Sequence, residues 1–461
     1  MAEVLASTNG YEHHTVGGLA AVYSFNPDDV AGDKVFTMLQ AEQPRGVLAS
    51  GIARTDGRTI PIIHSLGHVS DLGRSFQTGS ESRIALGHVR SENIPSQASE
   101  PYIQPVFHSG EHRDFAFAAN GHFNNILGVS KDLGFDYRNA GLPTNAAFMA
   151  RLIGDFADRE DQTIEDSLTE LLPLFSDSPY SYGLITEGQL IAGMGNGLQP
   201  LVRGEDENGT IYVATETGAL DLWQTGNQKL FLPGETIVVD NNGLRSSVGN
   251  VVGRVCVREF TDYALDFSRT SNRVEINTVR QEVGAKLAEE APVKGAQLVL
   301  GVPERGVPIG LEYANAIDVP YSGLVIKNRY HGGTPRPTDR EGHIIRVGSN
   351  YNLADPESVR DKVIVIVDNR MSTSETVRRL VDLTNDAGAK EVHLRFGTPL
   401  NDNSCEFGKH AEASMALDLD GVTSIEYLSL EGLLSTVRPY TRSSDSICTH
   451  CINGGQEVSI G

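Results

Sequence analysis

The chain has 461 residues, of which 39% are hydrophobic and 21% are charged. A single core rarely serves so long a chain, so we expect two domains of roughly 200 residues each. No apolar run approaches the roughly 20 residues of a membrane span, and the formal charge of −22 is spread along the sequence. These features exclude a membrane protein and disfavour nucleic acid as a partner. The first 15 residues lack the pattern of a secretory signal, so we expect a cytoplasmic protein.

The first half of the chain has the pattern of a strand-rich sandwich with few helices. Short apolar runs are separated by Gly, Asn and Asp, as is typical of strands joined by turns. One helix is clear, at residues 146–158, because Met149, Leu152, Ile153 and Phe156 share one face. The expected strands lie in residues 19–25, 51–53, 115–119, 182–191 and 236–239.

The second half alternates strands with helices, which predicts a parallel sheet covered on both faces. The expected strands are 297–302, 321–326, 362–367 and 391–396, and the expected helices are 274–290, 310–316 and 374–387. The predicted organisation is an N-terminal extension (1–16), a first domain (17–252), a second domain (253–445) and a C-terminal segment (446–461).

Short motifs along the chain resemble one known family. Gln-Pro-Arg-Gly at 43–46, Gly-His-Val-Arg at 87–90 and Ala-Asn-Gly at 119–121 are followed by Gly-Val-Pro-Glu-Arg-Gly at 301–306 and Ile-Lys-Asn-Arg-Tyr at 326–330. Their order is similar to that in the glutamine phosphoribosylpyrophosphate amidotransferases of the iron-sulfur type. The resemblance implies an α+β, four-layer Ntn-hydrolase-like sandwich joined to an α/β type I phosphoribosyltransferase-like domain with a parallel sheet.

Members of that family release ammonia from glutamine with an N-terminal cysteine, and the ammonia attacks the ribose carbon that carries pyrophosphate. The resemblance puts Gly17 at the position of the nucleophile, and no cysteine precedes Cys256. Without a thiol no thioester forms, so we predict that glutamine hydrolysis is absent. Thr15 is an alternative nucleophile if the extension is removed by processing.

The rest of the glutaminase pocket is partly retained. By resemblance, Arg90 matches the clamp for the substrate carboxylate, and Asn120 and Gly121 match the oxyanion donors. The family's acid that holds the substrate amine falls within residues 144–148, Thr-Asn-Ala-Ala-Phe, where no acid occurs. Arg90 and Asn120 are therefore either remnants of substrate binding or purely structural groups.

The second domain resembles the family's phosphoribosyl site with one acid missing. The strand that ends at Asp368 is followed by asparagine where the resemblance implies a second acid. The Ser/Thr cluster after it predicts either an anion site at a helix start or a simple N-cap. Magnesium is expected with a phosphoribosyl ligand. The candidate phosphoribosyl-binding residues are Asp368, Ser372, Thr373, Ser374, Lys327 and Arg336, the last in a Gly- and Arg-rich loop at 332–348.

All four cysteines of the chain fall where the resemblance places the ligands of an iron-sulfur cluster. They are Cys256, Cys405, and the Cys-x-x-Cys pair Cys448 and Cys451. Four thiolates suit a [4Fe-4S] cluster, and zinc is the alternative because spacing alone does not separate the two.

These features predict a catalytically degenerate homologue that binds a phosphorylated ribose or nucleotide in a regulatory or scaffolding role. The alternative is a phosphoribosyltransferase that uses ammonia or another amine and needs only the second domain. By resemblance, the chain forms a homo-oligomer or associates with an active paralogue.

Overall fold

The computed structural model describes residues 17–73, 76, 78–91, 100–110, 114–137, 140–264, 268–269, 275–328, 351–371, 374–400, 403, 419–455 and 458–459. The chain divides into two compact units, Met1–Arg254 and Val255–Gly461. The sequence placed this boundary at residue 252. Within the described ranges, no helix combines the length and the apolar character that crossing a membrane requires.

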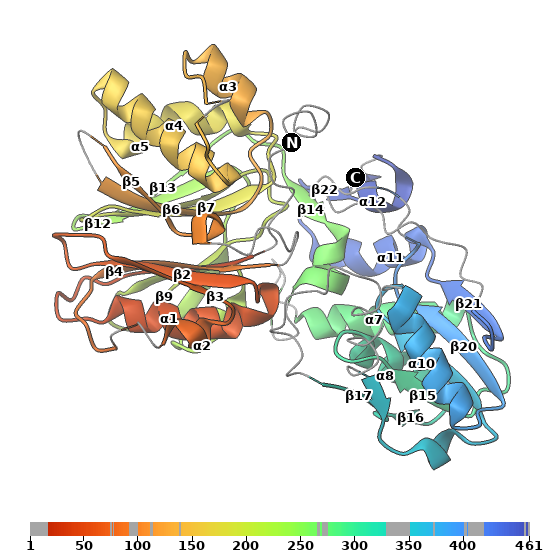
Figure 1. The fold of residues 1–461 in the computed structure, drawn as a ribbon. Coiled ribbons are helices and arrows are strands. Elements are labelled where there is room, and N and C mark those ends of the chain that lie inside the picture. The colour runs from red at the N-terminus through yellow and green to blue at the C-terminus, as the bar shows by residue number, and fades with distance from the viewer. Residues whose placement is uncertain are drawn as a thin grey trace. The chain divides into compact units, whose positions relative to one another are not determined.

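The first unit contains two antiparallel sheets flanked by helices (Figure 1). Its strands are β1 (Gly18–Tyr23), β2 (Ala49–Thr55), β3 (Ile62–Leu66), β4 (Ile84–Arg90), β5 (Val106–Ser109), β6 (Asp114–Gly121), β7 (Tyr180–Ile185), β8 (Leu190–Met194), β9 (Val202–Glu205), β10 (Ile211–Ala214), β11 (Gly226–Leu230), β12 (Glu235–Asp240) and β13 (Gly243–Val248). Its helices are α1 (Ala31–Glu42), α2 (Val69–Leu72), α3 (Ile126–Asp132), α4 (Asn145–Glu160), α5 (Ile164–Leu171) and α6 (Thr217–Asp221). The strand orders are β11-β9-β10-β1-β4-β2-β3 and β13-β12-β8-β7-β6-β5.

The alternation of side chains along the strands explains the four layers of this unit. In β1, Leu19 and Ala21 belong to the core between the sheets, whereas Ala20 and Val22 belong to the core under α1. Successive residues of a strand point to opposite faces, so an entirely buried strand must have a partner layer on each side. β6 alternates in the same way between the other sheet and the helices α4 and α5. The result is the helix-sheet-sheet-helix sandwich that the resemblance implied.

Two features of the first unit differ from the sequence expectation. Helices α1 and α5 were not predicted, and the run at 182–191 is a hairpin rather than one strand. The hydroxyl of Thr186 accepts hydrogen bonds from the N–H groups of Gly188 and Gln189 and closes the turn between β7 and β8. Because apolar residues flank this short polar turn on both sides, the sequence pattern was interpreted as one continuous strand.

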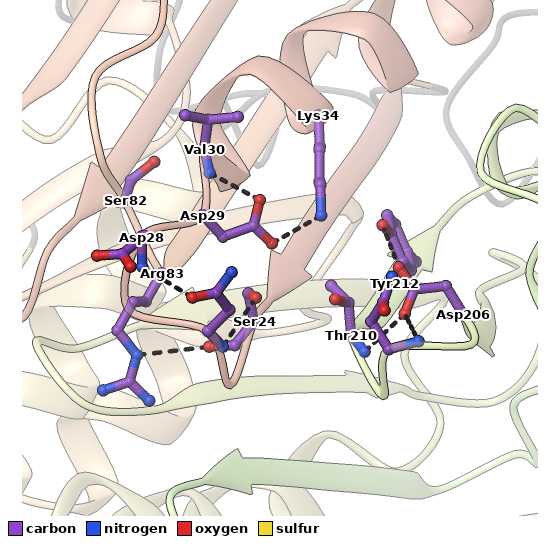
Figure 2. A network of polar contacts seen from close by, with 12 residues as sticks. Ser24, Asp28, Asp29, Val30, Lys34, Ser82, Arg83, Asp206, Thr210 and Tyr212 are labelled. Atoms are coloured by element: carbon purple, nitrogen blue, oxygen red, sulfur yellow. Dashed lines mark hydrogen bonds and ion pairs between the residues drawn. The ribbon is translucent and has the colours of Figure 1, made fainter.

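Helix α1 is fixed to the sheet by the ammonium group of Lys34 (Figure 2). Lys34 Nζ donates to Asp29 Oδ2 at 2.7 Å and lies 5.6 and 5.8 Å from the ring centres of Tyr212 and Trp223. The hydroxyl of Tyr212 donates to Asp206 Oδ2 at 2.9 Å. These contacts hold the helix whose last residue, Glu42, enters the site described below.

The second unit is built on a parallel sheet (Figure 1). Its strands are β14 (Arg254–Cys256), which spans the unit boundary, β15 (Leu298–Gly301), β16 (Tyr321–Ser322), β17 (Val325–Lys327), β18 (Tyr351–Leu353), β19 (Val363–Asp368), β20 (Glu391–Phe396), β21 (Ser424–Tyr427), β22 (Ser446–Cys448) and β23 (Val458–Ser459). Its helices are a π-helical turn (Glu259–Tyr263), α7 (Ile276–Glu290), α8 (Gly306–Ala316), α10 (Ser374–Asp386), α11 (Leu430–Val437) and α12 (His450–Asn453).

The five strands in the order β16-β15-β19-β20-β21 pair in parallel. Val365 and Val367 pack with α7, α8 and α11 on one face, and Ile364 and Ile366 pack with α10 on the other. This arrangement confirms the predicted parallel sheet with two covered faces. The expected strand at 321–326 is instead divided between two sheets, β16 in this one and β17 in an antiparallel pair with β18.

Candidate functional site

Gly17 lies in a fully enclosed position directly before β1. A Cβ atom added to Gly17 would lie 2.4 Å from the carbonyl oxygen of Val89 and 2.8 Å from both Asn120 Oδ1 and His88 Nε2. Real Cβ atoms do not approach other heavy atoms so closely, so the backbone of β4 would have to move. The space that a side chain at position 17 would need is therefore filled by neighbouring groups.

His88 and Asn120 form a buried pair that bridges the two sheets. His88 Nε2 lies 2.9 Å from Asn120 Oδ1, and Asn120 Nδ2 donates to the hydroxyl of Thr215 at 3.2 Å. Burial lowers the pKa of His88 to about 4, so the ring is neutral and its Nε2–H donates to Asn120. The predicted oxyanion donor Asn120 is thus held by contacts within the protein.

Gly121 is required by the backbone at the end of β6. Its φ is +86°, and a Cβ there would lie 1.8 Å from the carbonyl oxygen of Pro179. Only glycine adopts this conformation at such a close approach. This packing requirement would keep Gly121 in place whether or not its amide serves an oxyanion.

Arg90 ends β4 and is 2% exposed. Its Nη1 donates to the carbonyl oxygen of Tyr102 at 2.9 Å, and the guanidinium lies 5.7 Å from the centre of the Tyr102 ring. Burial lowers the pKa of Arg90 to about 10, which leaves it charged at neutral pH.

The resemblance puts the acid that holds the substrate amine within residues 144–148, where this chain has none. Ala146 is buried in the first turn of α4, and the hydroxyl of Thr144 caps that helix by accepting from the N–H of Ala147.

A buried cluster of two acids and one arginine lies next to Gly17. Arg45 Nε donates to the carbonyl oxygen of Gly17 at 3.1 Å, and Arg45 Nη1 forms an ion pair with Glu216. Glu42 Oε1 accepts from the backbone N–H of Glu216 at 3.0 Å. Burial raises the pKa of Glu42 to about 8. The Arg45 contact fixes the backbone at position 17, where the resemblance puts the nucleophile.

Sequence reasoning missed Glu42 and Glu216. A signal existed for Glu42, because Val35, Leu39 and Glu42 share one face of α1 and the acid interrupts the apolar stripe at helical spacing. Glu216 follows a buried strand and carries no comparable pattern. Its role depends on the pairing of β1 with β10.

The raised pKa of Glu42 predicts how the unfolding free energy depends on pH. An acid whose pKa is higher in the folded than in the unfolded state favours unfolding as the pH rises from about 4.5 to about 8. Glu42→Gln keeps the acceptor oxygen but cannot ionise, so its unfolding free energy should fall less steeply over this range. The slopes of unfolding free energy against pH for the variant and the wild type should differ by ~1.4 kcal/mol per pH unit at most.

Urea unfolding of the wild type and of Glu42→Gln at pH 5, 6.5 and 8 measures this difference. Glu205→Gln, an exposed change in the same unit, is the control and should follow the wild type. Parallel profiles for Glu42→Gln and the wild type would show that Glu42 is ionised in the folded state.

In the second unit, Asp368 ends β19 at the carboxyl edge of the parallel sheet. Its Oδ1 accepts from the N–H of Asn369 at 2.7 Å, and burial raises its pKa to about 7. A Cβ on Gly306, the first residue of α8, would lie 2.7 Å from the carbonyl oxygen of Val367 and 3.0 Å from Asp368 Oδ1. Helix α8 therefore starts in direct contact with the acid, and ligand sites of open α/β sheets form at this edge.

The other predicted phosphoribosyl-site residues are only partly described. Lys327 ends β17, and its charge lowers the pKa of Asp368 against the effect of burial. Ser374 is the first residue of α10. Ser372, Thr373, Arg336 and the loop at 332–348 lie outside the described residues, as do Thr15 and the extension 1–16.

Three of the four cysteines are described, and all three are buried. Cys256 ends β14 and Cys448 ends the neighbouring strand β22, while Cys451 lies in α12. The N–H of Asn403 donates to the carbonyl oxygen of Cys451 at 3.1 Å. Cys405 itself lies outside the described residues, and among the residues that are described no group of three or more His, Cys, Asp or Glu side chains could hold a metal ion.

The fold and the site residues together define a two-domain protein in which an amidohydrolase-type sandwich precedes a phosphoribosyltransferase-type sheet. Residues 281–420 match the phosphoribosyl transferase domain model. The chain is 30% identical over 413 residues to the chloroplastic amidophosphoribosyltransferase of Glycine max, covering 87% of this chain and 69% of that protein. It is 29% identical to the amidophosphoribosyltransferase of Mycobacterium tuberculosis, covering 92% and 83%. The chain belongs to the amidophosphoribosyltransferase family.

Solved structures confirm the predicted fold class. The glutamine phosphoribosylpyrophosphate amidotransferase of B. subtilis, complexed with ADP and GMP, superposes with a TM-score of 0.81 at 24% identity, covering 96% of this chain and 98% of that one. A structure described as the allosteric regulatory enzyme of purine biosynthesis gives a TM-score of 0.82 at 25% identity, covering 95% of both chains.

Proposed function

We propose that this member of the family does not hydrolyse glutamine, and that its second unit binds a phosphorylated ribose or a nucleotide in a regulatory or scaffolding role. The observation that carries the proposal is the enclosure of Gly17 by Val89, His88 and Asn120. A thioester needs a thiolate, and residues 1–254 contain no cysteine. Such a role suits a homo-oligomer or a complex with an active paralogue.

The ligand assignment rests on the carboxyl edge of the parallel sheet. Asp368 is retained at the end of β19, Lys327 is close enough to influence its pKa, and α10 begins just beyond. A helix start offers free N–H groups to an anion. The names of the relatives include phosphoribosyl transfer, and the B. subtilis structure holds ADP and GMP. A phosphorylated ribose or a purine nucleotide is the ligand class that agrees with these observations.

The second candidate function is phosphoribosyl transfer to ammonia or another amine. It is favoured by Asp368 and Lys327, because a single acid and a cation still orient a ribose phosphate. The missing second acid, replaced by Asn369, argues for binding without efficient transfer.

One experiment separates the two functions. The full chain, purified anaerobically, is incubated with phosphoribosylpyrophosphate and either glutamine or ammonium, and glutamate and pyrophosphate are measured separately. The first proposal expects neither product, together with GMP or ribose 5-phosphate binding by calorimetry. Pyrophosphate release with ammonium alone would establish the second function, and glutamate release would refute the loss of glutaminase activity.

We further propose that the four cysteines bind a [4Fe-4S] cluster, with zinc as the alternative. Cys256 and Cys448 end neighbouring strands of one three-stranded sheet, and Cys451 follows in α12, which supports this because thiolates are the ligands that both groups prefer. When bound, the group would link β14, β22 and α12 as a structural brace. Iron, sulfide and zinc analysis of anaerobically purified protein, with Cys451→Ser as a comparison, tests the assignment. We expect stoichiometric iron and sulfide in the wild type and their loss in Cys451→Ser.

A further inference from the structure

A buried ion cluster lies beside the end of β19 in the second unit. Asp262, in the π-helical turn Glu259–Tyr263, accepts from Arg258 Nε at 2.5 Å and from Asn369 Nδ2 at 2.6 Å, and lies 3.5 Å from Arg370 Nε. The side chains of Asp262 and Arg258 are 5% and 6% exposed. Although burial opposes it, the charges of Arg258 and Arg370 hold the pKa of Asp262 at about 2. Asp262 is therefore a fixed anion with both oxygens engaged.

This cluster bears directly on position 369, where the family resemblance implies an acid. The Asn369 side chain donates to an anion that lies 107 residues earlier in the chain, and to the carbonyl oxygen of Thr261 at 3.4 Å. An aspartate at 369 would place two carboxylates at hydrogen-bonding distance, and two such groups do not both ionise without a large penalty. The amide at 369 and the acid at 262 are thus a matched pair.

We infer that Asp262 is a positioning residue of the phosphoribosyl site that holds Asn369 and Arg370, so that the site binds a phosphomonoester of ribose without a divalent cation. The physical reason is charge. Magnesium is held in such sites by carboxylates together with substrate phosphates, and here Asp368 is the only acid left at the two final positions. Arg370, 35% exposed, adds a cation where it can meet a phosphate. This inference rests on the ligand class proposed above.

Charged groups from several segments act on Asp262 and Asp368, and Glu304 acts together with Asp368 on Tyr351. Arg258, Arg370 and Arg305 act on Asp262, and Arg370, Lys327 and Asp262 act on Asp368. These groups include more cations than anions, which favours an anionic ligand over a second metal-binding acid.

Two variants of the full chain test the pair. Asn369→Asp should lower Tm by roughly 4 °C or more at pH 8, and the loss should shrink at pH 5 because the new carboxyl can take up a proton. The double variant Asp262→Asn with Asn369→Asp exchanges the two groups and keeps the hydrogen bond with its direction reversed. Its Tm at pH 8 should rise above that of Asn369→Asp but stay below that of the wild type, because Arg258 then faces an amide in place of its buried anion. Asn352→Asp, an exposed change beside Arg379 in the same unit, is the control and should leave Tm unchanged.

Calorimetry with ribose 5-phosphate, with and without magnesium, tests the ligand preference. The wild type should bind with an affinity that magnesium changes less than about twofold, whereas the exchanged variant should bind about tenfold more tightly with magnesium than without it. Wild-type stability of Asn369→Asp at both pH values, or an exchanged variant no more stable than Asn369→Asp, would overturn the pairing. Magnesium-dependent binding by the wild type would overturn the preference. If the stability pattern holds but ribose 5-phosphate does not bind, the Asp262–Asn369 pair is supported and the inferred ribose phosphomonoester site is overturned, while GMP binding decides separately on the proposed function.

Discussion

Gly17→Cys is expected to release no glutamate from glutamine and to lower the unfolding free energy by about 1–3 kcal/mol. The new side chain would meet the carbonyl oxygen of Val89 and the His88–Asn120 pair, so the thiol gains its place only by displacing β4. In the full chain, residue 16 also holds the amine of position 17 in a peptide bond, which removes the base that activates such a nucleophile. Glutamate release and urea unfolding measure the two effects.

The control for this change is Gly188→Cys. Gly188 lies in the exposed turn between β7 and β8, and a Cβ there meets no atom within 4 Å, so the variant should unfold like the wild type. A second variant, Gly17→Cys with His88→Ala, removes the imidazole but leaves the Val89 carbonyl in place. Glutamate formation by either Gly17→Cys variant would contradict the conclusion that neighbouring groups fill the space at position 17.

Arg45→Met is expected to lower the unfolding free energy by about 3–5 kcal/mol, the larger of the two effects. The side chains of Arg45 and Glu216 are only 1% and 3% exposed, so the change leaves Glu216 buried without its cation. It also removes the bond from Arg45 Nε to the carbonyl oxygen of Gly17. Urea unfolding of the first unit, followed by circular dichroism, gives the magnitude.

Arg245→Met provides the comparison, because the ion pairs of Arg245 with Asp240 and Glu165 are on the surface and such pairs contribute little. Its unfolding should stay near that of the wild type. Should Arg45→Met prove equally stable, the Arg45–Glu216 pair would have to be solvated rather than buried.

These two expectations concern one pocket, which keeps its supporting groups although we propose that it does not hydrolyse glutamine. Arg45 still fixes the backbone at position 17, and Gly121 is still required by its positive φ. Asn120 is held by His88 and Thr215, and Arg90 is held by the carbonyl oxygen of Tyr102. Groups with a packing or hydrogen-bonding role remain costly to replace even when no substrate uses them.

Much of this protein could be predicted from its sequence. The order of the short motifs indicated the family, and the change from punctuated apolar runs to alternating strands and helices predicted the two kinds of sheet. The glycine at position 17 and the asparagine at position 369 were visible as single letters at motif positions. Such features are local in sequence, and therefore a sequence can reveal them.

Only the tertiary structure decided what surrounds those letters. The enclosure of Gly17 depends on His88 from β4 and Asn120 from the other sheet, and the partner of Asn369 is Asp262, from a segment 107 residues earlier. The pKa values of Glu42 and Asp368 are raised because folding buries them. Burial and pairing between distant segments arise only when the chain packs, so no local pattern of residues encodes them.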